Sequence, residues 1–138
     1  MDRKEFFRQS FIGLAVLGTT AGIAQCLGGC SSSTAPANVD FTLDLSASEN
    51  AVLRTVGGFL RTNGVIVACV AQDTYIAVQS SCTHEGATLS WQQNNNRFHC
   101  PEHGATFSRS GAVTNGPARD KLVSYTTTLN GTMLRVTS

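Results

Sequence analysis

Two short segments that each combine a cysteine with a histidine constrain this chain most. The first reads Cys82-Thr83-His84, and fifteen residues later the second reads Cys100-Pro101-Glu102-His103. Thiolate sulfur and imidazole nitrogen are ligands that iron and zinc prefer in proteins. Because the 138-residue chain has only 5 Cys and 3 His, chance explains this double pairing poorly. The sequence therefore predicts one metal site built from Cys82, His84, Cys100 and His103.

The order of the ligands helps to separate iron from zinc. Structural zinc sites usually place two cysteines in one knuckle, whereas each segment here places a cysteine before a histidine. The pattern resembles that of the Rieske 2Fe-2S family, in which Cys-x-His is followed, after about fifteen to seventeen residues, by Cys-x-x-His. The resemblance extends over about Asn50 to Val136. The further residues that carry it are Gly86, Gly104, the segment Asn115-Gly116-Pro117-Ala118, which is similar to the family's proline loop, and the closing-hairpin residues Leu122, Tyr125, Gly131, Leu134 and Val136.

The resemblance implies one 2Fe-2S cluster, with Cys82 and Cys100 on one iron and His84 and His103 on the other. It implies one-electron transfer as the function, either as a membrane-tethered carrier or as the small subunit of a respiratory oxidoreductase, with a redox protein as partner. Catalysis by this chain alone is not expected, because its length leaves no room for a separate catalytic domain. A membrane-anchored zinc module without redox activity, held by the same four residues, stays open as the alternative.

Two departures from the family's high-potential members predict a low reduction potential. Those members carry one extra cysteine in each loop, joined as a disulfide, where this chain has Ala87 and Glu102. They also carry a Ser and a Tyr after the second histidine, where this chain has Ala105 and Phe107. Because hydroxyl groups that donate to cluster sulfurs stabilise the reduced state, their loss favours the lower part of the family's range of about −150 to +300 mV.

Three side chains near the segments have a less definite role. Glu102 either lies beside the imidazoles, where its charge would favour their protonated forms, or is a solvated loop residue. His99 alternates with Phe98 in a strand-like run, which favours a strand histidine over a metal ligand. Cys69 lies in the apolar run Val65–Val70 and is expected to be a small buried hydrophobe.

Residues 1–29 predict an export signal that is not part of the fold. A basic start precedes the uncharged apolar run Phe11–Ile23, and Leu27-Gly28-Gly29 precedes Cys30 as in a bacterial lipobox, which would make Cys30 the lipidated residue. The start resembles a twin-arginine signal in which Lys4 replaces the second arginine. An uncleaved transmembrane helix is the alternative, because Phe11–Gly29 makes nineteen uncharged positions. The five glycines in that stretch disfavour the helix.

The remainder predicts a short tether followed by one all-β domain. Residues 30–38 are small and polar and predict a flexible tether, and residues 39–138 are enough for one core. Phe41–Leu45 alternates as a strand does, and Asn63-Gly64 and Asn130-Gly131 are hairpin signals. We expect a small antiparallel sandwich or barrel of the Rieske type, with the two cluster-binding loops projecting from one end.

The charge balance limits the partners. Seven basic and seven acidic residues remain after residue 29, so there is no excess of positive charge to meet phosphates, and a nucleic-acid partner is not expected. The chain is expected on the periplasmic side of a bacterial membrane, as an exported lipoprotein held by lipid on Cys30 or by an uncleaved helix.

Lipidation at Cys30 can be tested on the protein recovered from the membrane fraction. Mass spectrometry should find a mature N-terminus at Cys30 that carries acyl chains, because cleavage after Gly29 makes the lipidated cysteine the first residue. A protein that retains Met1 would exclude the lipobox reading and leave the uncleaved helix.

Overall fold

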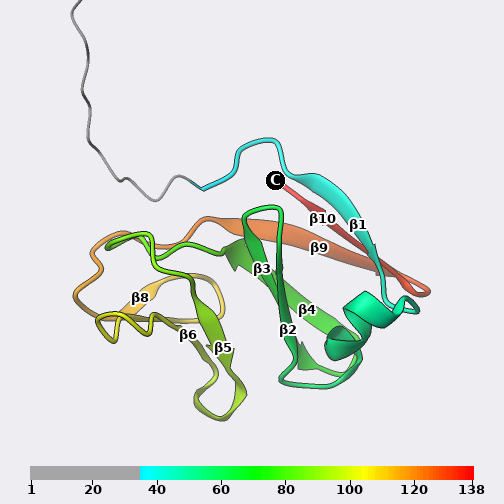
Figure 1. Ribbon diagram of the computed structural model, residues 1–138, viewed down its shortest axis with the longest axis horizontal. Helices are drawn as coiled ribbons and strands as arrows, with labels where there is room; N and C mark the ends of the chain where they lie inside the picture. Colours follow the sequence, from blue (N-terminus) through cyan, green and yellow to red (C-terminus); the bar gives the residue numbers. More distant parts are fainter. Residues whose placement is uncertain (1–34) are drawn as a thin grey trace, which may run out of the picture.

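The computed structural model describes residues 35–138 (Figure 1); the predicted export signal and Cys30 lie outside the described residues. Strands dominate this part of the chain, as predicted. In chain order the elements are β1 (Asp40–Asp44), the 3₁₀ helix η1 (Ser48–Arg54), β2 (Phe59–Thr62), β3 (Val65–Ala71), β4 (Thr74–Gln79), β5 (Ser90–Gln92), the 3₁₀ helix η2 (Gln93–Asn95), β6 (Arg97–His99), β7 (Thr106–Phe107), β8 (Val113–Asn115), β9 (Ser124–Asn130) and β10 (Met133–Thr137). Within residues 35–138, no helix is long and apolar enough to cross a bilayer.

The strands form two antiparallel sheets. The larger has the order β1-β10-β9-β4-β3-β2 and the smaller has the order β5-β6-β7-β8. The smaller sheet and its loops lie at one end of the molecule, and η1 and the β9–β10 turn lie at the other (Figure 1). The predicted all-β antiparallel fold, with loops projecting from one end, is therefore confirmed.

Strand β3 separates two hydrophobic cores. All six residues from Val65 to Val70 are buried, because successive side chains point to opposite faces of the sheet and each face is covered. Ile66, Ala68 and Val70 pack toward the smaller sheet, where Trp91, Phe98 and Phe107 fill the first core. Val65, Val67 and Cys69 pack into the second core, beneath β1, β9 and β10. This explains the unbroken apolar run, and Cys69 is buried as predicted.

Residues with a left-handed backbone (positive φ) close the hairpins, including those at the predicted turns Asn63-Gly64 and Asn130-Gly131. Asn63 (φ 51°) and Gly64 (φ 76°) join β2 to β3, and positive φ at both positions matches the twist of the flanking strands. Gly131 (φ 61°) follows β9, and Asp73 (φ 53°) lies between β3 and β4. The polar segment between β5 and β6 turns through η2, and Asn96 ends it in the left-handed region.

Helix η1 was not predicted, because long-range contacts hold it and no helical repeat marks it. Leu53 is fully buried in the second core. The Asn50 side chain donates to the Asp44 carbonyl at 2.9 Å, and the Arg54 guanidinium donates to the carbonyls of Leu45 and Ser46.

Pro36, inside the segment predicted as tether, lies against the domain. The Tyr125 hydroxyl donates to the Pro36 carbonyl at 2.8 Å. A Cβ on Gly64 would lie 3.1 Å from Pro36 Cγ, so the proline ring covers the β2–β3 turn. Ser80 N–H donates to the Gly64 carbonyl at 2.9 Å. The N-terminal segment therefore joins the body next to the end of β4, which leads into the first Cys/His segment.

Two side-chain amides, buried at Gln79 and partly buried at Gln93, connect the sheets to the segments between them. Gln79 accepts from Val123 N–H through Oε1 at 2.9 Å and donates through Nε2 to the Ser81 carbonyl at 2.9 Å. Gln93 donates to the Val70 carbonyl at 3.1 Å and accepts from Trp91 Nε1 at 2.8 Å. Among the described residues, no buried side-chain nitrogen or oxygen lacks a partner.

Replacing Gln79 with Leu should lower the free energy of unfolding by about 1–3 kcal/mol, because two backbone groups lose a partner. Urea denaturation followed by circular dichroism measures the change. The matched control is Gln72→Leu at an exposed turn position, where a change within about 0.5 kcal/mol is expected. Equal losses in the two variants would contradict a bridging role for Gln79.

Candidate metal centre

The two Cys/His segments fold into loops with the same backbone hydrogen bonds. In the first Cys/His loop (residues 82–87), Cys82 N–H donates to the Ala87 carbonyl at 2.7 Å and Gly86 N–H donates to the Cys82 carbonyl at 2.8 Å. In the second Cys/His loop (residues 100–105), the equivalent bonds join Cys100 to Ala105 at 2.8 Å and Gly104 to Cys100 at 3.0 Å. Each cysteine therefore opens a closed turn that ends five residues later.

The fifth residue of each loop is a glycine for a conformational reason. Gly86 has φ 73° and Gly104 has φ 75°, and only glycine adopts this region without steric cost. The histidine occupies the third position of the first loop, as His84, and the fourth position of the second loop, as His103. The two spacings, Cys-x-His and Cys-x-x-His, therefore place the histidine at different positions of the same turn.

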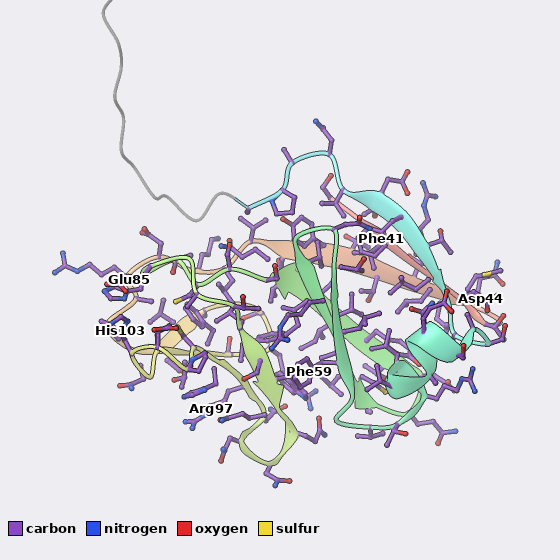
Figure 2. All side chains as sticks on the ribbon, in the orientation of Figure 1. Phe41, Asp44, Phe59, Glu85, Arg97 and His103 are labelled. Carbon is purple, nitrogen blue, oxygen red and sulfur yellow. The ribbon has the colours of Figure 1, made fainter. Side chains whose placement is uncertain are left out.

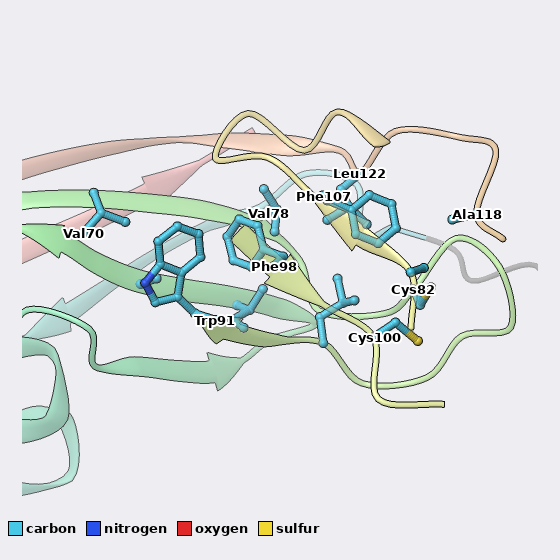
Figure 3. Close-up of a cluster of buried hydrophobic side chains, with 13 residues drawn as sticks. Val70, Val78, Cys82, Trp91, Phe98, Cys100, Phe107, Ala118 and Leu122 are labelled. Carbon is cyan, nitrogen blue, oxygen red and sulfur yellow. The ribbon is translucent and has the colours of Figure 1, made fainter. Parts of the chain in front are cut away.

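The four predicted ligands are brought together, with thiols inside and imidazoles outside. Cys82 and Cys100 are buried in the first core, at its end next to Phe107 and Leu122 (Figure 3). The rings of His84 and His103 lie edge to face with centroids 4.9 Å apart, and the side chain of His103 is 42 % exposed. The site therefore offers sulfur on its protein side and nitrogen on its solvent side.

The surroundings of Cys82 shift the pKa of its thiol. Burial raises the pKa of the Cys82 thiol; the backbone N–H of His84, 3.4 Å from its sulfur, lowers that pKa, and the adjacent Cys100 raises it further. Because metals bind thiolates, a metal held here must displace protons from both groups. The N–H of His84 points at the sulfur and supplies a donor that would favour its charged form.

A third loop, the proline loop (residues 115–121), covers both Cys/His loops. The Thr83 hydroxyl donates to the Asp120 carbonyl at 2.7 Å, and the Asn115 amide lies 3.4 Å from the Gly104 carbonyl. Ala118 is buried in the same core as the two thiols. The segment that resembles the family's proline loop therefore contacts both loops and shields the sulfur side of the site.

The second loop continues into residues without a free hydroxyl near the thiols. Ala105 and Phe107 are fully buried. Thr106 lies between them, and its hydroxyl forms a hydrogen bond with Thr114 at 2.7 Å. His99 lies in β6, opposite Ser90 and Thr106, in the strand position that the alternation favoured.

A carboxylate does lie beside the imidazoles, but it belongs to a residue that the sequence did not single out. Glu85 Oε2 is 3.4 Å from His103 Nδ1, so the pair joins the first loop to the second (Figure 2). Glu102 is exposed and has no partner among the ion pairs of the described residues. Glu85 and His103 lie in different loops and share no strand or helix. Only the way in which the two loops face each other brings the pair together.

The donor set fits an iron–sulfur centre that takes two sulfur and two nitrogen ligands. Both thiols come from the first positions of equivalent turns, and both imidazoles face the same side. His84, Glu85 and His103 also place one donor atom each within 4.8 Å of one another. Because exposed groups of this kind are common without a metal, that trio alone identifies no ion.

Comparison with known proteins places the chain in a family. The model of the Rieske [2Fe-2S] domain matches residues 30–126. The chain is 26 % identical over 136 residues to the cytochrome b6-f complex iron-sulfur subunit 2 of Synechocystis sp., covering 85 % of this chain and 76 % of the relative. It is 28 % identical over 146 residues to the cytochrome b6-f complex iron-sulfur subunit 1 of Nostoc sp., with coverages of 88 % and 79 %.

Solved structures agree with this assignment. The plasma membrane Rieske protein PetC3 of Synechocystis PCC 6803 is 33 % identical, with a TM-score of 0.51 over 59 % of this chain and 85 % of that protein. The ferredoxin of carbazole 1,9a-dioxygenase from Nocardioides aromaticivorans is 24 % identical, with a TM-score of 0.54 over 75 % and 98 % of the two chains, and shares the fold.

Proposed function

We propose, from the premise that this chain belongs to the Rieske 2Fe-2S domain family, that Cys82, His84, Cys100 and His103 are the ligands of its cluster. The protein carries one 2Fe-2S cluster and functions in electron transfer. When bound, the cluster supplies a centre that accepts and releases one electron. The observation that carries the ligand proposal is the pair of equivalent turns, each of which delivers one buried thiol and one accessible imidazole to the same point.

The arrangement of the side chains suits exchange with a partner protein. The thiols and the proline loop exclude water on the inner side, whereas the imidazole edges of His84 and His103 reach solvent and offer the shortest path for an electron. Imidazole ligands are neutral where thiolates are charged, so the site holds less negative charge than a four-thiolate site and gains an electron more easily. The redox partner should dock over the two histidines, in a contact of the small, weak class.

The site belongs, in this proposal, to the low-potential type without a disulfide between the loops. Ala87 and Glu102 stand where the high-potential members have cysteines, and the three cysteines of the described residues, Cys69, Cys82 and Cys100, are free. Ala105 and Phe107 offer no hydroxyl to the cluster sulfurs. Both features remove stabilisation of the reduced state.

Attachment to the outer face of a bacterial membrane is the third part of the proposal. Its support is the export signal and lipobox pattern that ends at Cys30, together with the similarity to a plasma membrane Rieske protein. The lipid on Cys30, or an uncleaved helix over Phe11–Gly29, would tether the domain close to a redox protein of the same membrane.

Replacing either proposed cysteine ligand should abolish cluster binding. Cys82→Ser and Cys100→Ser should lose iron, acid-labile sulfide and visible absorption, because each removes a sulfur that holds iron. The matched control is Cys69→Ala, which changes a buried cysteine in the second core and should keep the full cluster content. Full iron and sulfide in Cys82→Ser would refute the ligand assignment.

Restoring the missing hydroxyls should raise the reduction potential. A hydroxyl that reaches a cluster sulfur in Ala105→Ser or Phe107→Tyr should favour the reduced state by about 1 kcal/mol, which corresponds to roughly 40 mV for one electron. Redox titration measures the shift, and the native protein should titrate below about +200 mV. Phe41→Tyr, in β1 of the larger sheet, adds a hydroxyl elsewhere and should leave the potential unchanged. A native potential at the top of the family's range would contradict the low-potential type.

A further inference from the structure

The leading segment of the described chain lies beside the residues that lead into β9. Tyr125, the second residue of β9, donates from its hydroxyl to the Pro36 carbonyl at 2.8 Å. In Figure 1 the leading segment (cyan) joins the body above the start of β9 (orange). Any attachment of the chain upstream of Pro36 therefore acts on this side of the molecule.

Val123, just before β9, faces the same side as Pro36. Gln79 N–H donates to the Val123 carbonyl at 2.9 Å, which continues the pairing of β4 with β9 by one residue. Leu122 is buried in the first core and Tyr125 in the second. Because successive side chains of a paired strand point to opposite faces, Val123 shares the face of Tyr125, where the second core has ended. It is 45 % exposed, so it presents an uncovered apolar side chain beside the leading segment.

Two basic residues precede Val123 in the chain. Arg119 and Lys121 are exposed, and neither forms an ion pair within residues 35–138. Asp120 lies between them and is exposed too, so residues 119–123 carry two positive charges and one negative charge. Uncompensated basic side chains next to an exposed apolar one are the groups that bind the surface of an anionic bilayer.

We propose that Arg119, Lys121 and Val123 form a membrane-contacting patch that binds the anionic headgroups of the bilayer to which the chain is tethered. The proposal rests on the proposed attachment of the chain at Cys30 or by an uncleaved helix ending at Gly29. Its occupant is a lipid surface and not a soluble protein, because the length of the tether keeps that surface close to the patch.

The length of the tether follows from the sequence. Cys30 is six residues ahead of Pro36, and a fully extended chain of six residues spans about 20 Å. The bilayer surface is therefore never much farther than that from the place where Pro36 meets Tyr125. Val123 is two residues from Tyr125, so the patch lies at the part of the domain that the tether holds nearest to the lipid.

The patch needs the tether in order to be occupied. One basic residue near an anionic surface strengthens binding about fivefold, and Asp120 offsets the charge of one of the two basic residues. A contact of this strength binds poorly from free solution. A short tether raises the effective concentration of the surface to the millimolar range, so the contact forms in the attached protein and weakens as salt screens the charges.

Lys121 is its own reporter, because no other lysine follows residue 29. The full chain, processed and cluster-loaded, is added to preformed vesicles and treated with a water-soluble amine reagent, and peptide mass spectrometry measures the labelling of Lys121. Gln72→Lys adds a reference amine in the exposed β3–β4 turn, at the end that carries η1. The comparison is between vesicles of phosphatidylcholine alone and vesicles that also contain about 30 % phosphatidylglycerol, an anionic lipid.

The labelling of Lys121 relative to the reference amine should be about fivefold slower on the anionic vesicles, because the headgroups cover the ammonium group. The difference should be present at about 20 mM salt and nearly absent at about 500 mM salt. The reference amine corrects for any change in the reagent near the charged surface.

Two matched pairs of variants test the other members of the patch. Val123→Ser should reduce the protection of Lys121 about threefold, because an apolar contact with the lipid is lost. Val52→Ser, at an equally exposed valine of η1 (44 %), should leave the protection unchanged. Arg119→Gln should also reduce the protection, whereas Arg109→Gln, at an exposed position between β7 and β8, should not.

The outcomes separate the patch from the attachment. Flotation with both kinds of vesicle but equal labelling of Lys121 on the two would overturn the patch and leave the attachment intact. A protein that floats with neither kind of vesicle would remove the attachment, and the patch with it. Protection on vesicles of native membrane that is absent on protein-free anionic vesicles would assign the patch to an acidic protein and would also overturn this proposal.

Discussion

The structure depends on two pairs of backbone hydrogen bonds that close equivalent turns around Cys82 and Cys100. Each turn buries its sulfur and turns its imidazole outward, and each ends in a glycine with a left-handed backbone. Because the bonds are between main-chain groups, the geometry of the site does not depend on the identity of most loop side chains. The backbone bonds themselves do not fix the side chains between the cysteine and the glycine, and apart from the two histidines and Thr83 this chain places two carboxylates there, Glu85 and Glu102.

The smaller sheet and the proline loop serve this arrangement. Trp91, Phe98 and Phe107 fill the core between the sheets, and this core ends at the two thiols. The inner side of the site is therefore packed like a protein interior. Its outer side consists of the imidazole rings of His84 and His103, which face solvent. In the proposed ligand role, this packing would leave the sulfur side of the centre little room to relax when an electron arrives or leaves.

Local patterns in the sequence predicted the parts of this structure that local physics determines. The Cys/His spacing, the Asn63-Gly64 turn and the apolar run of β3 each follow from the chemistry of a few neighbouring residues. Helix η1 and the bridging amides Gln79 and Gln93 did not, because their partners lie elsewhere in the chain. Glu85 shows the same limit: the sequence directed attention to Glu102, which stands between two proposed ligands, whereas contact with the imidazole depends on how the two loops face each other.

The contact of Pro36 with Gly64 and Tyr125 has a mechanical consequence. The leading segment meets the body at the β2–β3 turn, where the Gly64 carbonyl accepts from Ser80 N–H. Ser80 follows β4 and precedes Cys82 by two residues. Figure 1 shows the same end of the larger sheet carrying the smaller one. Any force transmitted along the leading segment is thus applied close to the end that carries the Cys/His loops and far from η1. An anchor upstream of Pro36 would restrict the movement of the end that carries His84 and His103 far more than the movement of the end that carries η1.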